Sequence, residues 1–233
     1  MKVGLFGGTF NPFHNGHIRI IEHVRDTLGF DKIFLIPSAT PPHKPDLNLA
    51  PAQDRYAMVE GSIKNRQGLI VSDKEIIRGG ASFTIDTIRM FKEELDSKAD
   101  IFFLMGSDAF LDIDTWKQKD RIFHEVKVVI MLRWPSQTGR DLASFIREHI
   151  SKSYQYQVPD QNKGQNQPPD QAPNLPQTQS FIHQSKQTIY ICKVPRIDIS
   201  STLIRERVKQ GKSVEDLVPP NVLTIIQSKG LYK

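Results

Sequence analysis

The first 28 residues form a pattern of strand, glycine-rich turn and helix start, and this unit constrains the fold more than any other part of the chain. A short apolar run over residues 3–6 is followed by GGTFNPFHNGH at residues 7–17 and by a helical pattern from about Ile18. Glycines let the backbone approach a ligand closely, and a helix N-terminus favours an anion. With His14 and His17 at its mouth, the segment predicts a phosphate-binding site.

The spacing differs from that of the two common phosphate loops. A Walker loop needs a glycine, four residues and Gly-Lys-Ser/Thr, and a dinucleotide fingerprint needs Gly-x-Gly-x-x-Gly. Residues 7–17 supply neither, and a histidine pair, HxGH, takes the place of the lysine. The plain alternative is a tight turn with two surface histidines. The glycine pair, the threonine and both histidines fall at one junction of strand and helix, which favours the phosphate site.

Apolar runs alternate with helical patterns along most of the chain. We expect strands at residues 2–6, 32–37, 69–72, 75–77, 100–105, 126–132 and 188–194, and helices at 16–28, 54–64, 82–95, 140–150, 200–210 and 219–228. This alternation predicts an α/β fold: a Rossmann-like, doubly wound, mainly parallel sheet with helices on both faces. Ligands bind such sheets beyond the carboxyl ends of the strands. For the helix near residue 82, the predicted N-cap is Ser82 or Thr84.

The bulk properties set the limits of this interpretation. The chain has 233 residues, and we expect one domain over residues 1–233. Its net charge of +5 is compatible with ATP, with nucleic acid, with an acidic membrane, or with no particular partner. The single cysteine, Cys192, lies in an apolar run and is expected to be buried. No signal peptide and no apolar stretch of the ~20 residues needed for a bilayer is visible, so we expect a soluble, cytoplasmic protein.

Residues 152–187 differ from the rest in composition. They are rich in Gln, Asn, Pro, Ser and Asp and have almost no periodic apolar residues. Such a segment buries too little apolar surface to order itself. We therefore predict a flexible, disordered surface insertion within the domain, with a role in partner binding or oligomer contact as the alternative.

Four further clusters follow predicted strands or begin predicted helices. The loop PPHK ends in Lys44, a mobile charge for phosphate, and GSD offers the Asp108 carboxylate to ribose hydroxyls. Trp116 can stack on a flat heterocycle or simply pack in the core. SFTIDT at residues 82–87 and ISSTLIR at 199–205 place hydroxyls at helix starts, the second with Arg205 one turn in. Plain helix capping is the alternative for both.

These motifs, taken together, resemble those of a known enzyme family. HxGH is similar to the signature of the nucleotidyltransferase superfamily, and GGTFxPxHxGH resembles the nicotinate-nucleotide adenylyltransferases, which commonly have Asp at the position of Asn11. PPHK, SFTIDT, GSD, the tryptophan and ISSTxxR follow in the order of that family. The resemblance covers about residues 1–150 and 188–233.

The resemblance implies transfer of AMP from ATP to nicotinate mononucleotide, giving deamido-NAD and pyrophosphate in NAD biosynthesis. The implied catalytic residues are His14, His17, Lys44 and Arg205. The implied ATP-binding residues are Gly7, Gly8, Thr9, Phe10, His14, His17, Gly106, Asp108, Ile199, Ser200, Ser201, Thr202 and Arg205. The implied acceptor-binding residues are Lys44, Ser82, Phe83, Thr84 and Trp116. Mg²⁺ is expected to arrive with ATP, held by phosphates and water, so we expect no protein metal ligands.

Three alternatives stay open. The acceptor could be nicotinamide mononucleotide or another phosphorylated compound such as phosphopantetheine. From a different class, a non-catalytic nucleic-acid-binding protein would use clustered lysines and arginines with aromatics, but the basic residues here are scattered. We expect neither nucleic acid nor a membrane as a partner. The oligomeric state is undetermined, a homo-oligomer included.

Overall fold

The computed structural model describes residues 1–41, 48–134, 141–157 and 178–233. Within this part of the chain a central sheet has the strand order β3-β2-β1-β4-β5-β8-β7-β6. The strands are β1 (Lys2–Gly8), β2 (Lys32–Pro37), β3 (Leu69–Val71), β4 (Asp100–Gly106), β5 (Lys127–Trp134), β6 (Gln155–Gln157), β7 (Thr178–Ile182) and β8 (Ile189–Pro195). Neighbours from β3 to β8 are parallel, whereas β7 and β6 are antiparallel. The predicted α/β fold with a mainly parallel sheet is confirmed.

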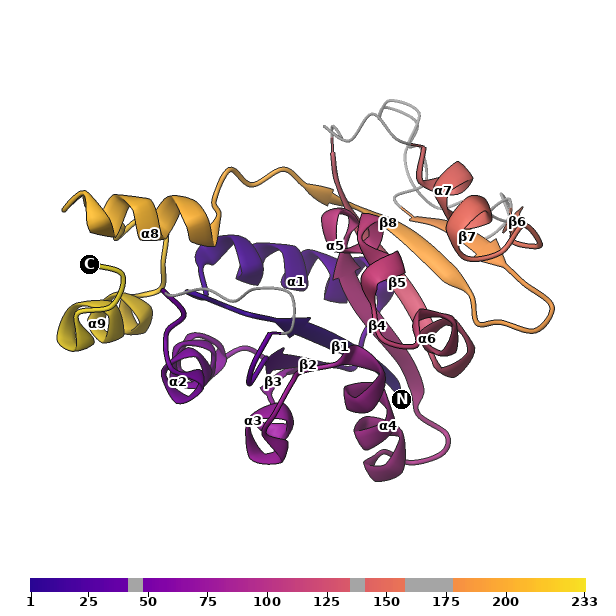
Figure 1. The fold of residues 1–233 in the computed structure, drawn as a ribbon, viewed down its shortest axis with the longest axis horizontal. Helices are drawn as coiled ribbons and strands as arrows, with labels where there is room; N and C mark the ends of the chain where they lie inside the picture. The colour runs from indigo at the N-terminus through magenta and orange to yellow at the C-terminus, as the bar shows by residue number, and fades with distance from the viewer. Residues whose placement is uncertain (42–47, 135–140, 158–177) are drawn as a thin grey trace, which may run out of the picture.

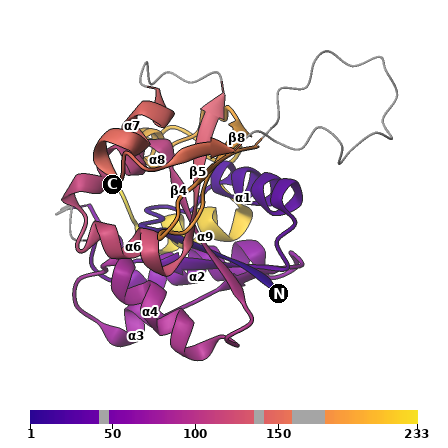
Figure 2. The ribbon, with the colours of Figure 1, turned by 90° about the vertical axis from the view of Figure 1, so that its right-hand side faces the viewer.

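Helices cover both faces of the sheet. They are α1 (Asn15–Leu28), α2 (Ala52–Ile63), α3 (Lys74–Arg78), α4 (Thr84–Glu94), α5 (Ser107–Leu111), the 3₁₀ helix η1 (Ile113–Thr115), α6 (Lys119–Glu125), α7 (Leu142–His149), α8 (Ser201–Lys209) and α9 (Pro220–Lys229). Figure 2 shows β4 and β5 between α6 and α7 on one side and α1 on the other. In Figure 1, α8 and α9 lie at the end of the molecule opposite to β6 and β7.

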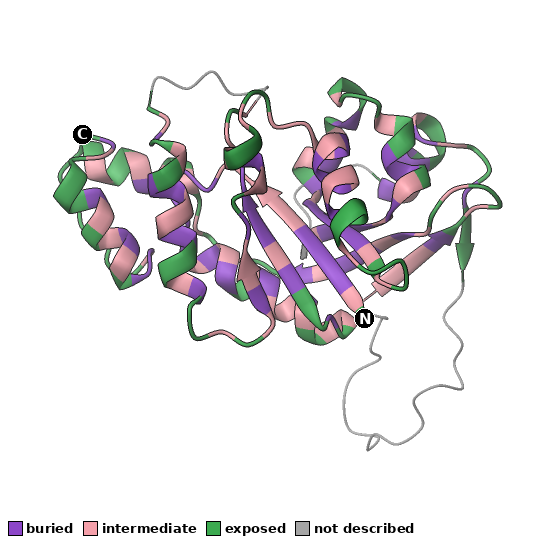
Figure 3. Cartoon of the chain, turned by 90° about the horizontal axis from the view of Figure 1, so that it is seen from below, coloured by how far each residue is buried: buried purple, intermediate pink, exposed green. Residues whose placement is uncertain are grey.

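The two faces of the sheet have separate cores because alternate residues of a strand point to opposite sides. Phe102 and Leu104 of β4 join the core beneath α1, α2 and α9. Phe103 and Met105 join the core beneath α4, α5, α6 and α7. Buried residues accordingly run along the strands and the inner sides of the helices in Figure 3. Cys192 is buried in the first core, as predicted, and this burial raises the pKa of its thiol to about 11.

The strand order reverses between β1 and β4, which marks the place where a doubly wound sheet binds ligands. β1 leads into α1 and β4 leads into α5, so GGTFNPFHNGH and GSD lie side by side at the carboxyl ends of neighbouring strands. β8 ends at Pro195, shortly before ISSTLIR at residues 199–205, where α8 begins. The fold therefore gathers the main predicted motifs at one edge of the sheet.

Several local predictions fail, each for a physical reason. Residues 75–77 belong to α3 rather than to a strand. A run of three residues is too short to distinguish the helical period of about 3.6 residues from the strand period of about two. Neither Ser82 nor Thr84 caps α4: its N-cap is Phe83, and the Ser82 hydroxyl accepts from the Ala39 N–H at 2.9 Å. α5, η1 and α6 were not predicted, because their 3–7-residue lengths carry too little periodicity.

The segment 152–187 is more structured at its ends than its composition indicates. Gln155–Gln157 and Thr178–Ile182 pair as β6 and β7 at the edge of the sheet, and Phe181 is buried there. Backbone pairing orders these residues in spite of their polar composition. Residues 158–177 lie outside the described part of the chain. Across that described part, no helix combines the length and the apolar character that a membrane crossing requires.

Candidate active site

His14 and His17 form a stacked pair at the N-terminus of α1. His14 is the N-cap, in extended backbone conformation, and its backbone N–H donates to Nδ1 of His17 at 3.2 Å. The two rings stack with centroids 3.6 Å apart, and the other face of His17 stacks on Phe13 at 5.2 Å. Because Nδ1 of His17 accepts a hydrogen bond, the proton of the neutral ring lies on Nε2. The ring is thus held in one orientation and one tautomer.

Two glycines of the motif are required by close packing of side chains. A Cβ on Gly16, the glycine of HxGH, would lie 3.0 Å from Nδ1 of His14, so a larger residue would push that ring away from the helix start. A Cβ on Gly8 would lie 2.7 Å from the Phe10 ring. Phe10 itself is buried, with a positive φ of 49°, and meets His17 edge-on at 5.2 Å.

The loop between β1 and α1, residues 9–14, is called the histidine loop below. The start of α8 is hydrogen-bonded to this loop, although the bonded residues lie about 190 positions apart in sequence. Nη1 of Arg205 donates to the Asn11 carbonyl at 2.8 Å, and the Ser201 hydroxyl donates to the Pro12 carbonyl at 3.0 Å. The Ser200 hydroxyl accepts from the Leu203 N–H at 3.1 Å, which confirms the predicted N-cap. The start of α8 therefore faces the start of α1 across a cleft.

We call this cleft the histidine cleft. Its lining residues are Thr9, Asn11, His14, Gly16, His17, Ile20, Leu49, Asp108, Ile197, Ile199, Ser200, Ser201, Thr202 and Arg205. Hydrogen-bond donors for an anion dominate around the two helix starts, and one carboxylate, Asp108 of α5, also lines the cleft. The arrangement suits a ligand with a phosphate chain at one end and hydroxyls at the other.

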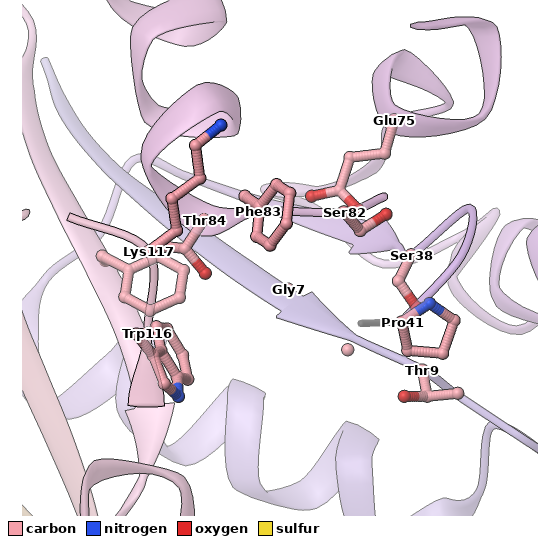
Figure 4. Close-up of a pocket in the computed structure, with 12 residues that line it drawn as sticks. Gly7, Thr9, Ser38, Pro41, Glu75, Ser82, Phe83, Thr84, Trp116 and Lys117 are labelled. Atoms are coloured by element: carbon pink, nitrogen blue, oxygen red, sulfur yellow. The ribbon is translucent and has the colours of Figure 1, made fainter. Parts of the chain in front are cut away.

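A second cleft, the aromatic cleft, adjoins the first. Its lining residues are Gly7, Gly8, Thr9, Ser38, Pro41, Glu75, Ser82, Phe83, Thr84, Phe103, Trp116 and Lys117. In Figure 4, Trp116, Thr84 and Lys117 lie at one end, Gly7 in the middle and Thr9 at the other. Thr9 lines both clefts, so two ligands bound in them would meet there.

Charged side chains frame the aromatic end of this cleft. The Lys117 ammonium lies 4.6 Å from the centre of the Phe83 ring and donates to Oδ2 of Asp86 at 2.9 Å. Asp86 also lies 4.0 Å from Arg78 and 3.9 Å from Arg89, so it links the end of α3 to α4. Trp116 packs edge-on against Phe103 at 6.0 Å and keeps part of its surface in the cleft.

Arg55 supports both clefts from beneath, and sequence reasoning missed it. Its side chain is 0% exposed, and its guanidinium donates to the carbonyls of Ala50, Thr9 and Ala39 at 2.9, 2.8 and 3.1 Å. These carbonyls belong to the loops after β1, after β2 and before α2. Burial lowers the pKa of Arg55, with Tyr232 and Glu75 as nearby opposing influences. The available signal was a charged residue on the apolar face of α2, next to Met58 and Val59.

The predicted site residues divide into three groups. Those that line the histidine cleft are Thr9, His14, His17, Asp108, Ile199, Ser200, Ser201, Thr202 and Arg205; those that line the aromatic cleft are Gly7, Gly8, Thr9, Ser82, Phe83, Thr84 and Trp116. Phe10 and Gly106 line neither: Phe10 packs under His17, and Gly106 gives room to the Asp108 carboxylate, which lies 2.8 Å from the place of its missing Cβ. Lys44 lies outside the described residues.

The described residues also show where a divalent cation could and could not be held. They contain no group of three or more His, Cys, Asp or Glu side chains arranged for a metal ion. The carboxylate that lines the histidine cleft is Asp108. Magnesium prefers octahedral oxygen ligands and retains several waters, so one carboxylate with ligand phosphates fits it, whereas an all-protein cage does not.

Comparison with known proteins gives a consistent result. Residues 5–207 match the family described as cytidylyltransferase-like. A "probable nicotinate-nucleotide adenylyltransferase" of Desulfatibacillum aliphaticivorans is 37% identical over 234 residues, covering 100% of both chains. A protein of the same name from Citrifermentans bemidjiense is 36% identical over 232 residues, covering 100% of this chain and 98% of its own.

A solved structure is similar over nearly the whole chain. It is the Plasmodium falciparum nicotinic acid mononucleotide adenylyltransferase complexed with NaAD, with a TM-score of 0.67 and 17% sequence identity. The match covers 99% of this chain and 97% of that one. At this identity the likeness speaks for the fold alone.

Proposed function

The chain belongs to the cytidylyltransferase-like family, and on this premise we propose that it transfers AMP from ATP to nicotinate mononucleotide, giving deamido-NAD and pyrophosphate. The observation that carries this is the pair of adjoining clefts with Thr9 in common. One cleft has the donors for a triphosphate, and the other has an aromatic plane and a helix start for a pyridine carboxylate. The two substrates meet where the new bond forms.

The reaction needs little from the protein beyond placement and charge stabilisation. A phosphate monoester has a second pKa near ~6, so the acceptor is largely a dianion at neutral pH. One of its oxygens attacks the α-phosphorus of ATP, and the bond from that phosphorus to the bridging oxygen of the β-phosphate breaks, releasing pyrophosphate. No proton has to be removed from the nucleophile. The catalytic work is in-line alignment and stabilisation of charge on the phosphate oxygens.

We assign His17 the role of a fixed hydrogen-bond donor in this step. Its Nδ1 accepts from the His14 N–H, so the proton of the neutral ring is on Nε2, and the residue lines the histidine cleft. We assign His14 to the same phosphates, and Arg205 with Lys44 to the departing pyrophosphate. Arg205 is suited to this because the Asn11 carbonyl anchors its guanidinium beside the loop. A planar guanidinium follows phosphate charge well.

Mg²⁺ is proposed as the cofactor, entering with ATP. When bound it neutralises charge on the phosphates, and among the described residues Asp108 is the carboxylate that lines the cleft beside it. The alternative role of Asp108, accepting from the ribose hydroxyls of ATP, uses the same position. We further propose that the reaction takes place in the cytoplasm, where ATP is abundant.

The aromatic cleft is assigned to the acceptor. Trp116 offers a plane for the pyridine ring, and Thr84 begins α4, whose free N–H groups favour a carboxylate. Phe83 and Ser82 complete the wall, Ser82 chiefly by holding the loop after β2 through Ala39. A carboxylate at a helix start gains more than an uncharged amide, so this geometry favours the acid.

The test is pyrophosphate release with Mg·ATP and either nicotinate or nicotinamide mononucleotide. We expect kcat/KM to be much higher for the acid. A preference for the amide would retain the phosphate chemistry and overturn the acceptor assignment. Absence of turnover with both would direct the search to other phosphorylated acceptors.

A further inference from the structure

Two buried polar atoms of residues that line the aromatic cleft have no role in the mechanism above. Oε2 of Glu75 and Oγ of Ser38 are inaccessible to solvent and make no hydrogen bond among the described residues. The residues are 5% and 8% exposed, and both line the cleft. An unsatisfied buried polar atom destabilises the fold, and more so when it is charged. Such atoms in a binding cleft point to a ligand group that satisfies them.

The position of Glu75 is fixed from its other side. Its Oε1 accepts from the Thr87 hydroxyl at 2.5 Å, and its own carbonyl accepts from the Gly79 N–H at 3.0 Å. Arg55 is close enough for Glu75 to influence its pKa, so a buried positive charge helps to offset the carboxylate. Ser38 is anchored separately, because its N–H donates to the Gly8 carbonyl at 3.0 Å. Both residues are therefore held in the wall of the cleft by a rigid frame.

The place of these atoms along the cleft selects the part of the ligand that meets them. Figure 4 shows Glu75 reaching toward Ser82 above Gly7, between the Trp116 end and the Thr9 end. In the proposed acceptor the pyridine ring lies at Trp116 and the phosphate at Thr9. The ribose that joins them then lies between the two ends, with Glu75 above it and Ser38 beside Pro41 toward the Thr9 end.

The hydrogen-bonding groups of the acceptor also identify the ribose as the part that meets Glu75. A carboxylate oxygen accepts hydrogen bonds only. In nicotinate mononucleotide the pyridine carboxylate and the phosphate dianion are acceptors too, and they are repelled by Glu75. The 2′- and 3′-hydroxyls of the ribose are the groups that can donate. We propose that Glu75 and Ser38 form the ribose-binding subsite of the acceptor, with Glu75 Oε2 accepting from one ribose hydroxyl and Ser38 Oγ bonding the other.

A second consequence concerns the position of the nucleotide along the cleft. A nucleotide shifted along the cleft would bring one of its anionic ends toward the Glu75 carboxylate. The subsite therefore both attracts the ribose and disfavours a shifted pose. This inference rests on the proposed acceptor. The experiment is therefore chosen so that a failure of the ribose subsite can be distinguished from a failure of the proposed function.

The test crosses protein variants with acceptors that lack one hydroxyl. Wild-type, Glu75→Gln and Ser38→Ala proteins are compared with nicotinate mononucleotide and its 2′-deoxy and 3′-deoxy forms, by kcat/KM and by calorimetric Kd. A hydrogen bond to a charged group corresponds to about 10- to 100-fold. In the wild type we expect that loss for one deoxy acceptor. In Glu75→Gln the same deoxy acceptor should differ from the natural one by less than about threefold.

Controls separate binding from structure. Glu75→Gln keeps an oxygen for the Thr87 hydroxyl, and KM for ATP should not change, because Glu75 does not line the histidine cleft. Glu93→Gln, on the exposed side of α4, is the matched control and should behave as wild type. Ser38→Ala keeps the N–H bond to Gly8 and should remove the preference for the other hydroxyl only.

Each outcome decides the inference. If Glu75→Gln lowers kcat/KM and binding of natural and deoxy acceptors by the same factor, Glu75 is only a structural residue and the subsite is wrong. If the wild-type protein binds both deoxy forms as tightly as the natural acceptor, the subsite is wrong as well. If the wild type neither binds nor adenylylates nicotinate mononucleotide, the proposed function fails first, and this inference falls with it.

Discussion

The histidine cleft and the aromatic cleft meet at Thr9 but are constructed in different ways. Most of the lining of the histidine cleft comes from two contiguous motifs, with Ile20, Leu49, Asp108 and Ile197 in addition. The bonds between the two motifs, Arg205 to Asn11 and Ser201 to Pro12, join side chains of one to backbone carbonyls of the other. The aromatic cleft is assembled from six separate segments, and Glu75 in its wall and Arg55 beneath it lie outside every predicted motif. The residues of the proposed phosphate site thus lie mainly in short sequence motifs, whereas recognition of the acceptor depends on tertiary packing.

His17→Ala tests the histidine cleft most directly and should have the largest effect. Loss of one preorganised donor to transition-state charge costs about 10²–10³ in kcat. The KM for ATP should change much less, because the other donors of the cleft continue to bind the ground state. Steady-state kinetics measures both. His124→Ala, an exposed histidine on α6, is the matched control. An unchanged turnover in His17→Ala would remove this residue from the mechanism.

Arg55→Met should damage both clefts at once. The substitution leaves three buried carbonyls, those of Ala50, Thr9 and Ala39, without their donor. We expect a loss of about 3 kcal/mol in the free energy of unfolding, measured by urea titration. The KM should rise for both substrates, since Thr9 is common to the two clefts.

Arg66→Met, at a residue just beyond the other end of α2, is the control for Arg55→Met. Arg66 pairs with Glu22 where both side chains are about one-third exposed, at 38% and 31%. Removal of such a pair should cost at most about 1 kcal/mol. If the two variants lose equal stability, the buried guanidinium is not the common support of the clefts.

Trp116→Ala should affect only the aromatic cleft. Stacking of a heterocycle on an aromatic side chain contributes about 1–3 kcal/mol, so the KM for the acceptor should rise roughly 10- to 100-fold. The KM for ATP should stay the same, and Trp116→Phe should recover part of the loss. A variant that loses affinity for ATP instead would show that the two clefts are assigned the wrong way round.

The difference between the clefts also explains how much could be predicted from sequence. The parallel sheet follows from apolar runs such as residues 32–37, which match β2 residue for residue. The histidine cleft follows from GGTFNPFHNGH and ISSTLIR because their spacing already fixes two helix starts. Arg55 and Glu75 could not be assigned, since their partners are backbone carbonyls and a hydroxyl brought near only by the fold. The strands β6 and β7 were missed because composition says nothing about pairing with a neighbouring edge.

Asn11→Asp is expected to have the smallest effect on stability. It tests how far the histidine loop depends on the hydrogen bonds of the Asn11 side chain. Oδ1 of Asn11 accepts from the Ala50 N–H at 3.0 Å and the Tyr232 hydroxyl at 2.8 Å, while Nδ2 donates to the Asn48 carbonyl at 3.1 Å. Aspartate, common in the resembling family, keeps both accepted bonds and strengthens them, but it loses the donated one. These opposing changes should leave stability within about 1 kcal/mol of wild type.

Asn11→Ala and Tyr232→Phe show whether Asn11 positions the loop or takes part in the reaction. Asn11→Ala removes the shared acceptor and should cost about 2 kcal/mol, and Tyr232→Phe should cost about half of that. If the anchor acts through Tyr232, the double variant should lose less than the two single losses added together. In all of them kcat should follow the fraction of folded protein. A fall in kcat of more than tenfold in fully folded Asn11→Asp would contradict a positioning role, since this variant keeps the loop anchored and changes only the charge beside the phosphates.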